Sequence, residues 1–216
     1  MKERGMIFND AMVRAILEGR KTQTRRPVKN VRADNCLVIR KPTKKRNGVY
    51  THVMDAPEHG LCPFGNVGDR IWVRETFNAF WLDNDVIQEI KDGVSLASEL
   101  CDYKADYSDS SKPAEGWTPS IHMPRWASRI LLEITDVRVE RLHDMSEADA
   151  KAEGASPATY KITPPEAVYR VGFGDIWRGI YGQENWLSNP WVYKPTVRIV
   201  EVNVPRAAGI RINGGE

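Results

Sequence analysis

The sequence predicts an α+β fold in which a small curved sheet or barrel carries short helices on its rim. Two observations predict it. Segments with alternating apolar residues recur between turns rich in glycine, asparagine and aspartate, and the helical patterns between these segments are short. The chain has 216 residues, 41% of them hydrophobic, which is enough to bury a sizeable core. We expect one domain over residues 1–205 and a flexible, Gly-rich tail over residues 206–216.

The first predicted element is an amphipathic helix over residues 10–18. Its apolar residues repeat at helical spacing, Asn9 or Asp10 can cap its start, and Gly19 suits its end. Residues 21–26 then alternate as in a strand.

A polar, basic stretch over residues 30–66 follows, in which the Asn47-Gly48 pair predicts a hairpin. The next strands are predicted at residues 70–77 and at residues 130–139. In the second of these the alternation changes parity after Thr135, which favours a bulge or bend.

A short helix is predicted after residue 145. Ser146 and Asp149 have the spacing of a capping box, and Gly154 suits the end of the helix. The last predicted helical residue is therefore Glu153.

The C-terminal part predicts one more helix and the closing strands. The helix covers residues 165–181, although Gly172 and Gly174 weaken it or kink it. The closing strands are predicted at residues 192–193 and 197–202, with Pro195 at a bulge or sheet edge.

The strongest chemical signal is the motif Gly-Arg-Lys-Thr-Gln-Thr-Arg-Arg at residues 19–26. It places four cations in seven residues, beside two hydroxyl groups, at a chain reversal. Such a set can hold an anion and can also supply a nucleophile and a base. The motif begins a segment, residues 20–46, that holds eleven Lys and Arg against one acid, whereas the rest of the chain holds 20 basic and 28 acidic residues. Local positive potential of this kind attracts nucleic acid.

Several other classes of function lack support in the sequence. The three cysteines are an odd count without a CxxC pair, so a disulfide framework is not expected. No glycine-rich phosphate loop or metal motif is present, and we expect no cofactor and no metal. No apolar run approaches the roughly 20 residues that span a bilayer, and the start of the chain lacks a signal peptide. We therefore expect a cytoplasmic protein without membrane contact. A zinc site can be drawn from four residues, although their spacing fits no compact knuckle: Cys36, His52, His59 and Cys62.

The order of these motifs resembles the ASCH (activating-signal-cointegrator homology) family, in particular its longer bacterial and bacteriophage members. The resemblance implies a β-barrel related to the PUA RNA-binding domain, with insertions near residues 30–60, 78–125 and 155–185. It also implies that the protein is located in a bacterial cell and that a phage gene is one possible origin of it. The matching pieces are Gly19–Thr24, Cys62–Gly65, Gly68–Thr76, Ile130–Leu142, Ala148–Gly154, Trp186–Val192 and Val197–Val202.

The resemblance also implies candidate functions. A small bacterial member removes the acetyl group from acetylated cytidine with a Lys, a Thr and a Glu, which match Lys21, Thr24 and Glu153 here. Other members are reported as nucleic-acid binders, and one as a ribonuclease. We therefore expect recognition of RNA, DNA or a modified nucleoside in a basic cleft, with amide hydrolysis on the base left open. The alternatives are a non-catalytic RNA- or DNA-binding module and an interaction protein of a phage or prophage.

The catalytic set makes chemical sense under two conditions. The hydroxyl of Thr24 needs a base, and the amine of Lys21 can serve only if burial and neighbouring cations lower its pKa. In a regular strand Lys21 and Thr24 point to opposite faces, so the chain must bend between them. We expect the Lys21 amine within about 5 Å of the Glu153 carboxylate, the range in which opposite charges shift each other's pKa.

The remaining candidates are cations. Lys21 and Arg25 are alternatively plain phosphate contacts, and Arg26 or Arg74 can stabilise an oxyanion. Because Arg74 and Glu75 face opposite ways on one strand, we expect Arg74 to face the site. The expected binding set is Arg20, Arg25, Arg26, Arg74, Lys44, Lys45 and Arg46; its last three members are also explained by a solvated basic loop.

Overall fold

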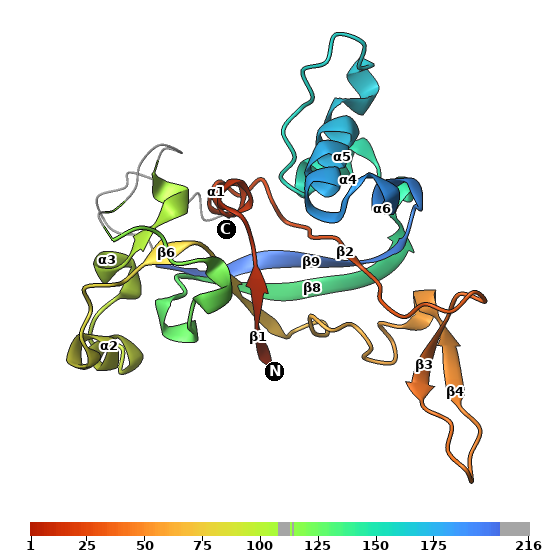
Figure 1. The fold of residues 1–216 in the computed structure, drawn as a ribbon, viewed down its shortest axis with the longest axis horizontal. Helices are drawn as coiled ribbons and strands as arrows, with labels where there is room; N and C mark the ends of the chain where they lie inside the picture. The colour runs from red at the N-terminus through yellow and green to blue at the C-terminus, as the bar shows by residue number, and fades with distance from the viewer. Residues whose placement is uncertain (108–112, 114, 204–216) are drawn as a thin grey trace. The chain divides into compact units, whose positions relative to one another are not determined.

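The computed structural model describes residues 1–107, 113 and 115–203, so the predicted tail over residues 206–216 lies outside the described residues. The described chain mixes helices and strands, which confirms the α+β class (Figure 1). Its strands are β1 (Glu3–Ile7), β2 (Arg26–Pro27), β3 (Cys36–Arg40), β4 (Val49–His52), β5 (Arg70–Arg74), β6 (Phe77–Asn78), β7 (Asp102–Tyr103), β8 (Ile130–Arg141) and β9 (Trp191–Val202).

Five of these strands form the main sheet in the order β1-β5-β8-β9-β2. Strands β1 and β5 are parallel, whereas β5-β8 and β2-β9 are antiparallel. Among the described strands β1 and β2 end this order, so the sheet is open. Two small antiparallel sheets, β3-β4 and β6-β7, accompany it.

The helices are short, as the sequence predicted. The α-helices are α1 (Asp10–Leu17), α2 (Asn84–Lys91), α3 (Ala97–Leu100), α4 (Glu147–Ala152), α5 (Val168–Tyr181) and α6 (Gln183–Leu187). Single 3₁₀ turns are η1 (Val53–Asp55), η2 (Lys104–Asp106), η3 (Ser120–His122), η4 (Arg125–Ala127), η5 (Leu142–Asp144) and η6 (Pro165–Ala167). None of the described helices has the length and apolar composition that a membrane span requires.

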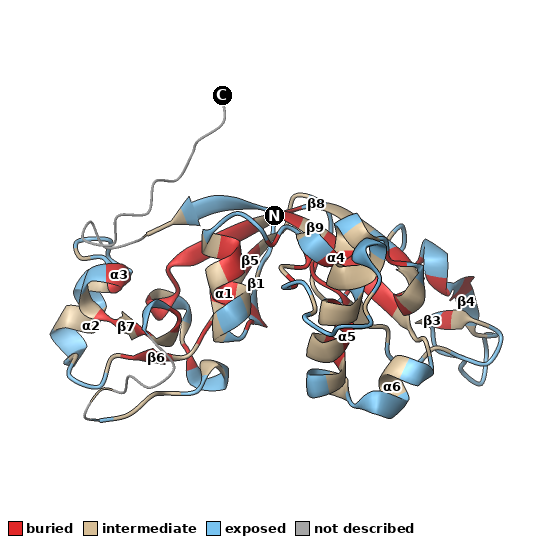
Figure 2. Cartoon of the chain, turned by 90° about the horizontal axis from the view of Figure 1, so that it is seen from above, coloured by how far each residue is buried: buried red, intermediate tan, exposed pale blue. Residues whose placement is uncertain are grey.

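The described chain divides into two compact units. Unit 1 comprises residues 1–19, 70–133 and the chain from residue 198, and unit 2 comprises residues 20–69 and 134–197. Each unit has apolar residues in its interior (Figure 2). A core cluster of unit 1 is Phe77, Ala97, Cys101, Tyr103, Met123 and Ala127. Unit 2 has one cluster under α4 and α5 that includes Leu142, Ala150, Phe173 and Trp177, and another beneath β3 that includes Leu37, Val53, Val139 and Tyr193.

Local capping signals fix the ends of α1 and α4. The side chain of Asn9 accepts from the amide of Met12 at 2.9 Å, and Gly19 adopts φ +72° after the helix. At α4 the side chains of Ser146 and Asp149 form the predicted capping box. Both helices therefore begin and end within one or two residues of the predicted positions.

Helix α5 continues through both of its glycines, and each glycine allows a close approach of neighbouring atoms. A Cβ on Gly172 would lie 2.0 Å from the carbonyl oxygen of Ser156. A Cβ on Gly174 would lie 3.2 Å from both Arg178 and Trp186. Glycine in a helix interior costs about 1 kcal/mol relative to alanine. Here that cost is offset by packing that a larger residue would block.

One predicted detail is corrected. The β3-β4 hairpin turns at Thr43 and Arg46, whose backbones exchange hydrogen bonds of 2.9 and 3.2 Å, and not at Asn47-Gly48. Strand β8 includes Thr135 and strand β9 includes Pro195. The bulge or bend at Thr135 and the bulge or edge at Pro195 stay predictions.

Candidate functional site

The segment that follows Gly19 lies in unit 2 between the end of α4 and strand β9. The amide of Thr22 donates to the carbonyl of Ala152 at 2.8 Å, and the carbonyl of Thr22 accepts from the amide of Val197 at 2.8 Å. Only isolated bridges occur at residues 21 and 23, so residues 21–25 are not a regular strand.

The irregular backbone frees residues 21–25 from the strict alternation of a strand. Lys21, Thr24 and Arg25 are all buried, with 4%, 3% and 3% of their surface exposed. Strict alternation would bury only one of the neighbours Thr24 and Arg25. The amide of Thr24 donates to the carbonyl of Pro195 at 3.1 Å, which holds this bend against β9.

The amine of Lys21 lies 2.9 Å from the carboxylate of Glu153, which confirms the predicted proximity across 132 positions of sequence. The same amine donates to the carbonyls of Gln23 and Glu153, each at 2.8 Å. Three acceptors thus match the three donors of an ammonium group. The two side chains are 1% and 3% exposed, so this contact is closed to solvent.

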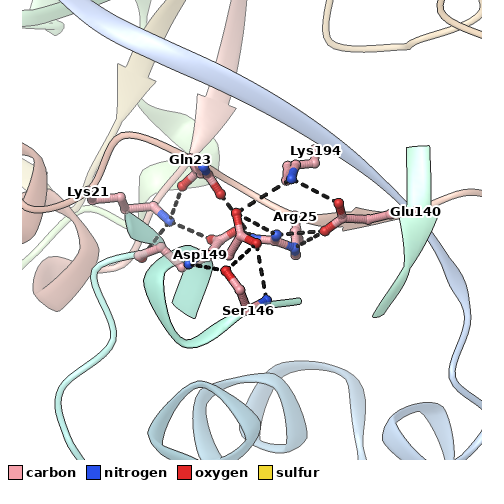
Figure 3. A network of polar contacts seen from close by, with 8 residues as sticks. Lys21, Gln23, Arg25, Glu140, Ser146, Asp149 and Lys194 are labelled. Atoms are coloured by element: carbon pink, nitrogen blue, oxygen red, sulfur yellow. Dashed lines mark hydrogen bonds and ion pairs between the residues drawn. The ribbon is translucent and has the colours of Figure 1, made fainter. Parts of the chain in front are cut away.

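Arg25 extends the contact into a network (Figure 3). Its guanidinium donates to Glu153 at 3.0 Å and to Glu140 at 2.6 and 2.9 Å, and it lies 3.4 Å from Asp149. Lys194 lies 2.8 Å from Glu140 and 3.5 Å from Asp149. We call this set of three cations and three carboxylates the unit-2 cluster. Its charges are mutually compensated.

The pKa values in the unit-2 cluster reflect burial and pairing. Burial lowers the pKa of Lys21 more than the carboxylate of Glu153 raises it. For Arg25 burial acts in the same direction, but Glu153 and Glu140 outweigh it and raise the pKa. Burial alone would raise the pKa of Asp149, yet hydrogen bonds from Ser146 and the nearby cations bring it below its ordinary value. A catalytic base requires a lowered pKa of this kind, and Lys21 is the residue of the unit-2 cluster that meets this requirement.

The other predicted cations lie elsewhere. Arg26 is half-buried and donates to the hydroxyl of Tyr181 at 3.3 Å, and Arg20 is exposed. Arg74 belongs to unit 1, where its guanidinium donates to the carbonyl of Ile121 and lies 5.4 Å from the Trp72 ring centroid. Of the neighbours Arg74 and Glu75, the buried one is Glu75, at 0% exposed.

The basic arm, defined as residues 29–46, carries the remaining cations at the surface. It includes β3 and the hairpin turn, and its cations are all exposed: Lys29, Arg32, Arg40, Lys41, Lys44, Lys45 and Arg46. Lys29 and Lys41 also line a hollow of about 780 Å³ within unit 2, which we call the arm hollow. Leu37, Phe64 and Tyr193 supply apolar wall.

A second buried charge cluster, in unit 1, was not predicted from the sequence. Arg129 donates to both carboxylate oxygens of Glu75 at 3.0 Å and to Asp106 at 2.6 and 2.9 Å. Its guanidinium carbon lies 3.9 Å from the ring centroid of Tyr103. We call these residues the unit-1 cluster. The parity of β5 offers the missed signal, because Glu75 continues the alternation of buried Ile71 and Val73.

Metal ligands and known relatives complete the description. Within residues 1–107, 113 and 115–203, no group of three or more His, Cys, Asp or Glu side chains could hold a metal ion.

Comparison with models of protein families, with curated proteins and with solved structures gives no match to this chain.

Proposed function

We propose that this protein binds single-stranded nucleic acid through the basic arm of unit 2. The observation that carries the proposal is the division of cations within residues 20–46. Lys21 and Arg25 are buried against carboxylates, whereas every cation of the basic arm is exposed. Only Arg32 in the arm has an ion pair with another described residue, namely with Asp34 at 3.3 Å. Exposed cations that outnumber nearby acids supply the sequence-independent part of nucleic-acid affinity.

The arm hollow adds a place for a base. Lys29 and Lys41 stand where they can meet phosphates, and the half-buried ring of Phe64 offers an apolar surface for a nucleobase. Base stacking on aromatic side chains contributes about 1–3 kcal/mol per base and needs an unpaired strand. A cation-lined hollow with an aromatic wall therefore favours a single strand over a duplex.

We further propose that the chain is related to the ASCH family. Because the fold of that family is related to the PUA RNA-binding domain, this relation favours RNA over DNA. The order of elements supports this relation: α1 ends at Gly19, the basic motif follows, and β5, β8, α4 and β9 come in the family's sequence. The contact between Lys21 and Glu153 joins two residues that the resemblance pairs.

The test is the salt dependence of RNA binding. The triple variant Lys44→Ala, Lys45→Ala, Arg46→Ala should lower the slope of log affinity against log salt by about 0.7 for each phosphate of a single strand that is no longer neutralised. Fluorescence anisotropy with a labelled single-stranded RNA, between about 50 and 200 mM salt, measures it. The matched control is Arg138→Ala, Lys151→Ala, Lys161→Ala, which removes three exposed cations of the same unit outside the arm. Equal slopes in both triple variants would contradict the proposal.

A second candidate function is hydrolysis of the amide of acetylated cytidine by Lys21, Thr24 and Glu153. The lowered pKa of Lys21 favours it. Its three occupied donors count against it, because a base must first release one of those bonds. Wild-type turnover that is lost in Thr24→Ala, with nucleoside binding retained, would support this mechanism. If the wild type binds the nucleoside without turnover, the hydrolytic function is excluded and the binding function remains.

A further inference from the structure

The Asn47-Gly48 pair lies between the hairpin turn of the basic arm and strand β4. The turn is closed by Thr43 and Arg46, so the pair takes no part in it, and neither residue of the pair belongs to a helix or strand. Asn47 is exposed and Gly48 is half-buried. The pair that the sequence singled out as a turn is therefore an irregular stretch of backbone at the surface.

Both groups that a deamidation reaction needs are unengaged at this pair. Deamidation joins the backbone nitrogen of the residue after an asparagine to the carbon of the asparagine side-chain amide. Among the described residues, neither the side-chain amide of Asn47 nor the backbone N–H of Gly48 has a hydrogen-bond partner. No hydrogen bond within the described chain must therefore be broken before the two groups meet.

The glycine at position 48 removes the steric obstacle to this attack. Because Gly48 lacks a Cβ, its nitrogen is open to the side chain of Asn47, and its backbone has wide conformational freedom. The exposed cation of the adjacent Arg46 favours the negative charge that develops as the nitrogen loses its proton. By contrast, the exposed Asn30 and Asn66 are each followed by a valine, whose β-branched side chain crowds the backbone nitrogen.

We propose that Asn47 deamidates spontaneously and that the carboxylate it gains weakens the binding of nucleic acid to the basic arm. In the first step the nitrogen of Gly48 forms a bond to the side-chain amide carbon of Asn47. The carbon–nitrogen bond of the side-chain amide breaks, and ammonia leaves with the proton of the Gly48 amide. Water then opens the resulting succinimide ring at either carbonyl group, which gives aspartate or isoaspartate. The net reaction consumes water, releases ammonia and transfers no electrons.

The new charge lies directly beside the cations of the basic arm. The arm has a single acid, Asp34, against seven cations, so a carboxylate at position 47 lowers the positive potential next to Arg46. Isoaspartate also lengthens the main chain just before β4, where Val49 pairs with Arg40. The effect on binding rests on the proposed function, whereas the deamidation itself does not.

Peptide mapping by mass spectrometry tests the reaction in the full chain after incubation at mildly alkaline pH, which favours loss of the amide proton. The peptide with Asn47 should gain the mass of an acid in place of an amide, with isoaspartate among the products, while Asn30 and Asn66 stay amides. The other Asn-Gly pair, Asn213-Gly214, lies outside the described residues and gives a separate peptide. Asn47→Gln is the control, because the longer side chain must close a larger ring. The proposal is overturned if Asn47 stays an amide for as long as Asn30 and Asn66 do.

Salt-dependent binding of a labelled single-stranded RNA, measured by fluorescence anisotropy, tests the consequence. Asn47→Asp carries the charge of the product, and Asn47→Gln carries none. Asn47→Asp should lower the slope of log affinity against log salt by about 0.7, the value for one phosphate contact of a single strand. Incubated wild type should shift toward Asn47→Asp, whereas incubated Asn47→Gln should not change.

The outcomes separate the reaction, its effect and the proposed function. If Asn47→Asp binds RNA with the slope and affinity of the wild type, the effect on binding is overturned even where deamidation occurs. A fresh wild type that binds no RNA overturns the proposed function and the effect on binding together. The mass measurement then still decides whether Asn47 is a site of deamidation.

Discussion

The unit-1 and unit-2 clusters handle buried charge in different ways. In the unit-1 cluster one guanidinium, at 0% exposed, joins the buried Glu75 to the half-exposed Asp106 and lies on the ring of Tyr103. In the unit-2 cluster three cations alternate with three carboxylates, so most members have two opposite partners. The first cluster depends on one residue, and the second has redundant contacts.

This difference separates the structural charges from those available to a ligand. A buried ion pair that loses one partner leaves an uncompensated charge, which costs far more than an exposed pair contributes. The charges of both clusters therefore stabilise the fold. The cations of the basic arm are exposed and belong to neither cluster.

The largest expected effect is that of Arg129→Met. It leaves the fully buried carboxylate of Glu75 without its two hydrogen bonds, so the free energy of unfolding should fall by about 3–5 kcal/mol. Urea unfolding measures it. The double variant Arg129→Met, Glu75→Met should recover part of the loss, because it removes the uncompensated charge. A single variant as stable as the wild type would show that the unit-1 cluster does not depend on Arg129.

A smaller loss is expected for Lys21→Met. Glu153 keeps its contact with Arg25 at 3.0 Å, so the carboxylate stays paired and the loss should be about 1–3 kcal/mol, the range for a removed hydrogen-bonding partner. The same urea experiment measures it. A loss that equals or exceeds that of Arg129→Met would contradict the redundancy of the unit-2 cluster.

The pH dependence of Asp149 gives a third test. Its pKa in the folded state lies below the ordinary value of 3.8, so its ionised form stabilises the fold above that pH, and this stabilisation is lost as the pH falls further. Asp149→Asn should therefore be less stable than the wild type at neutral pH, and the two curves should converge in acid. Thermal unfolding between about pH 7 and pH 2 follows this. The stability curve of the control Asp34→Asn, which removes a carboxylate from an exposed pair, should run parallel to that of the wild type. A constant difference in stability between Asp149→Asn and the wild type at all pH values would contradict the lowered pKa of Asp149.

The smallest effect on stability should come from the triple variant of the basic arm. Lys44, Lys45 and Arg46 are exposed, and such surface substitutions change the free energy of unfolding by less than about 0.5 kcal/mol each. Urea unfolding should give nearly the wild-type midpoint while the salt slope of RNA binding falls. A clearly destabilised triple variant would mean that the arm cations support the fold.

Short-range signals were sufficient for α1 and α4, whereas α2, α3 and α6 were not predicted. The capping box of Ser146 and Asp149 and the glycine after α1 act within one helical turn, and both were predicted. Long-range partners were not accessible in this way. Glu140 and Lys194 lie 115 and more positions beyond Arg25 and become its neighbours only through the fold, while Glu153 was placed by family resemblance.

The glycines of α5 show the same limit from another side. Helix propensity alone counts Gly172 against a helix. The close approach that favours glycine there involves the backbone of Ser156, which lies outside the helix sequence. Glu75 differs from these cases, since the alternation of β5 carried its inward direction in the sequence.

The order in which the two units appear along the chain has a consequence for synthesis on the ribosome. The chain enters unit 1, leaves it at residue 20, returns at residue 70, leaves again at residue 134 and returns at residue 198. Unit 2 needs β9 as far as residue 197, and unit 1 needs the amide of Asn203, which donates to the carbonyl of Arg129 at 2.9 Å. Neither unit can finish folding while residues up to these points are inside the exit tunnel. Strand β8 therefore lacks its neighbour β9 until late in translation, and a nascent chain stalled before β9 should be a substrate for chaperones.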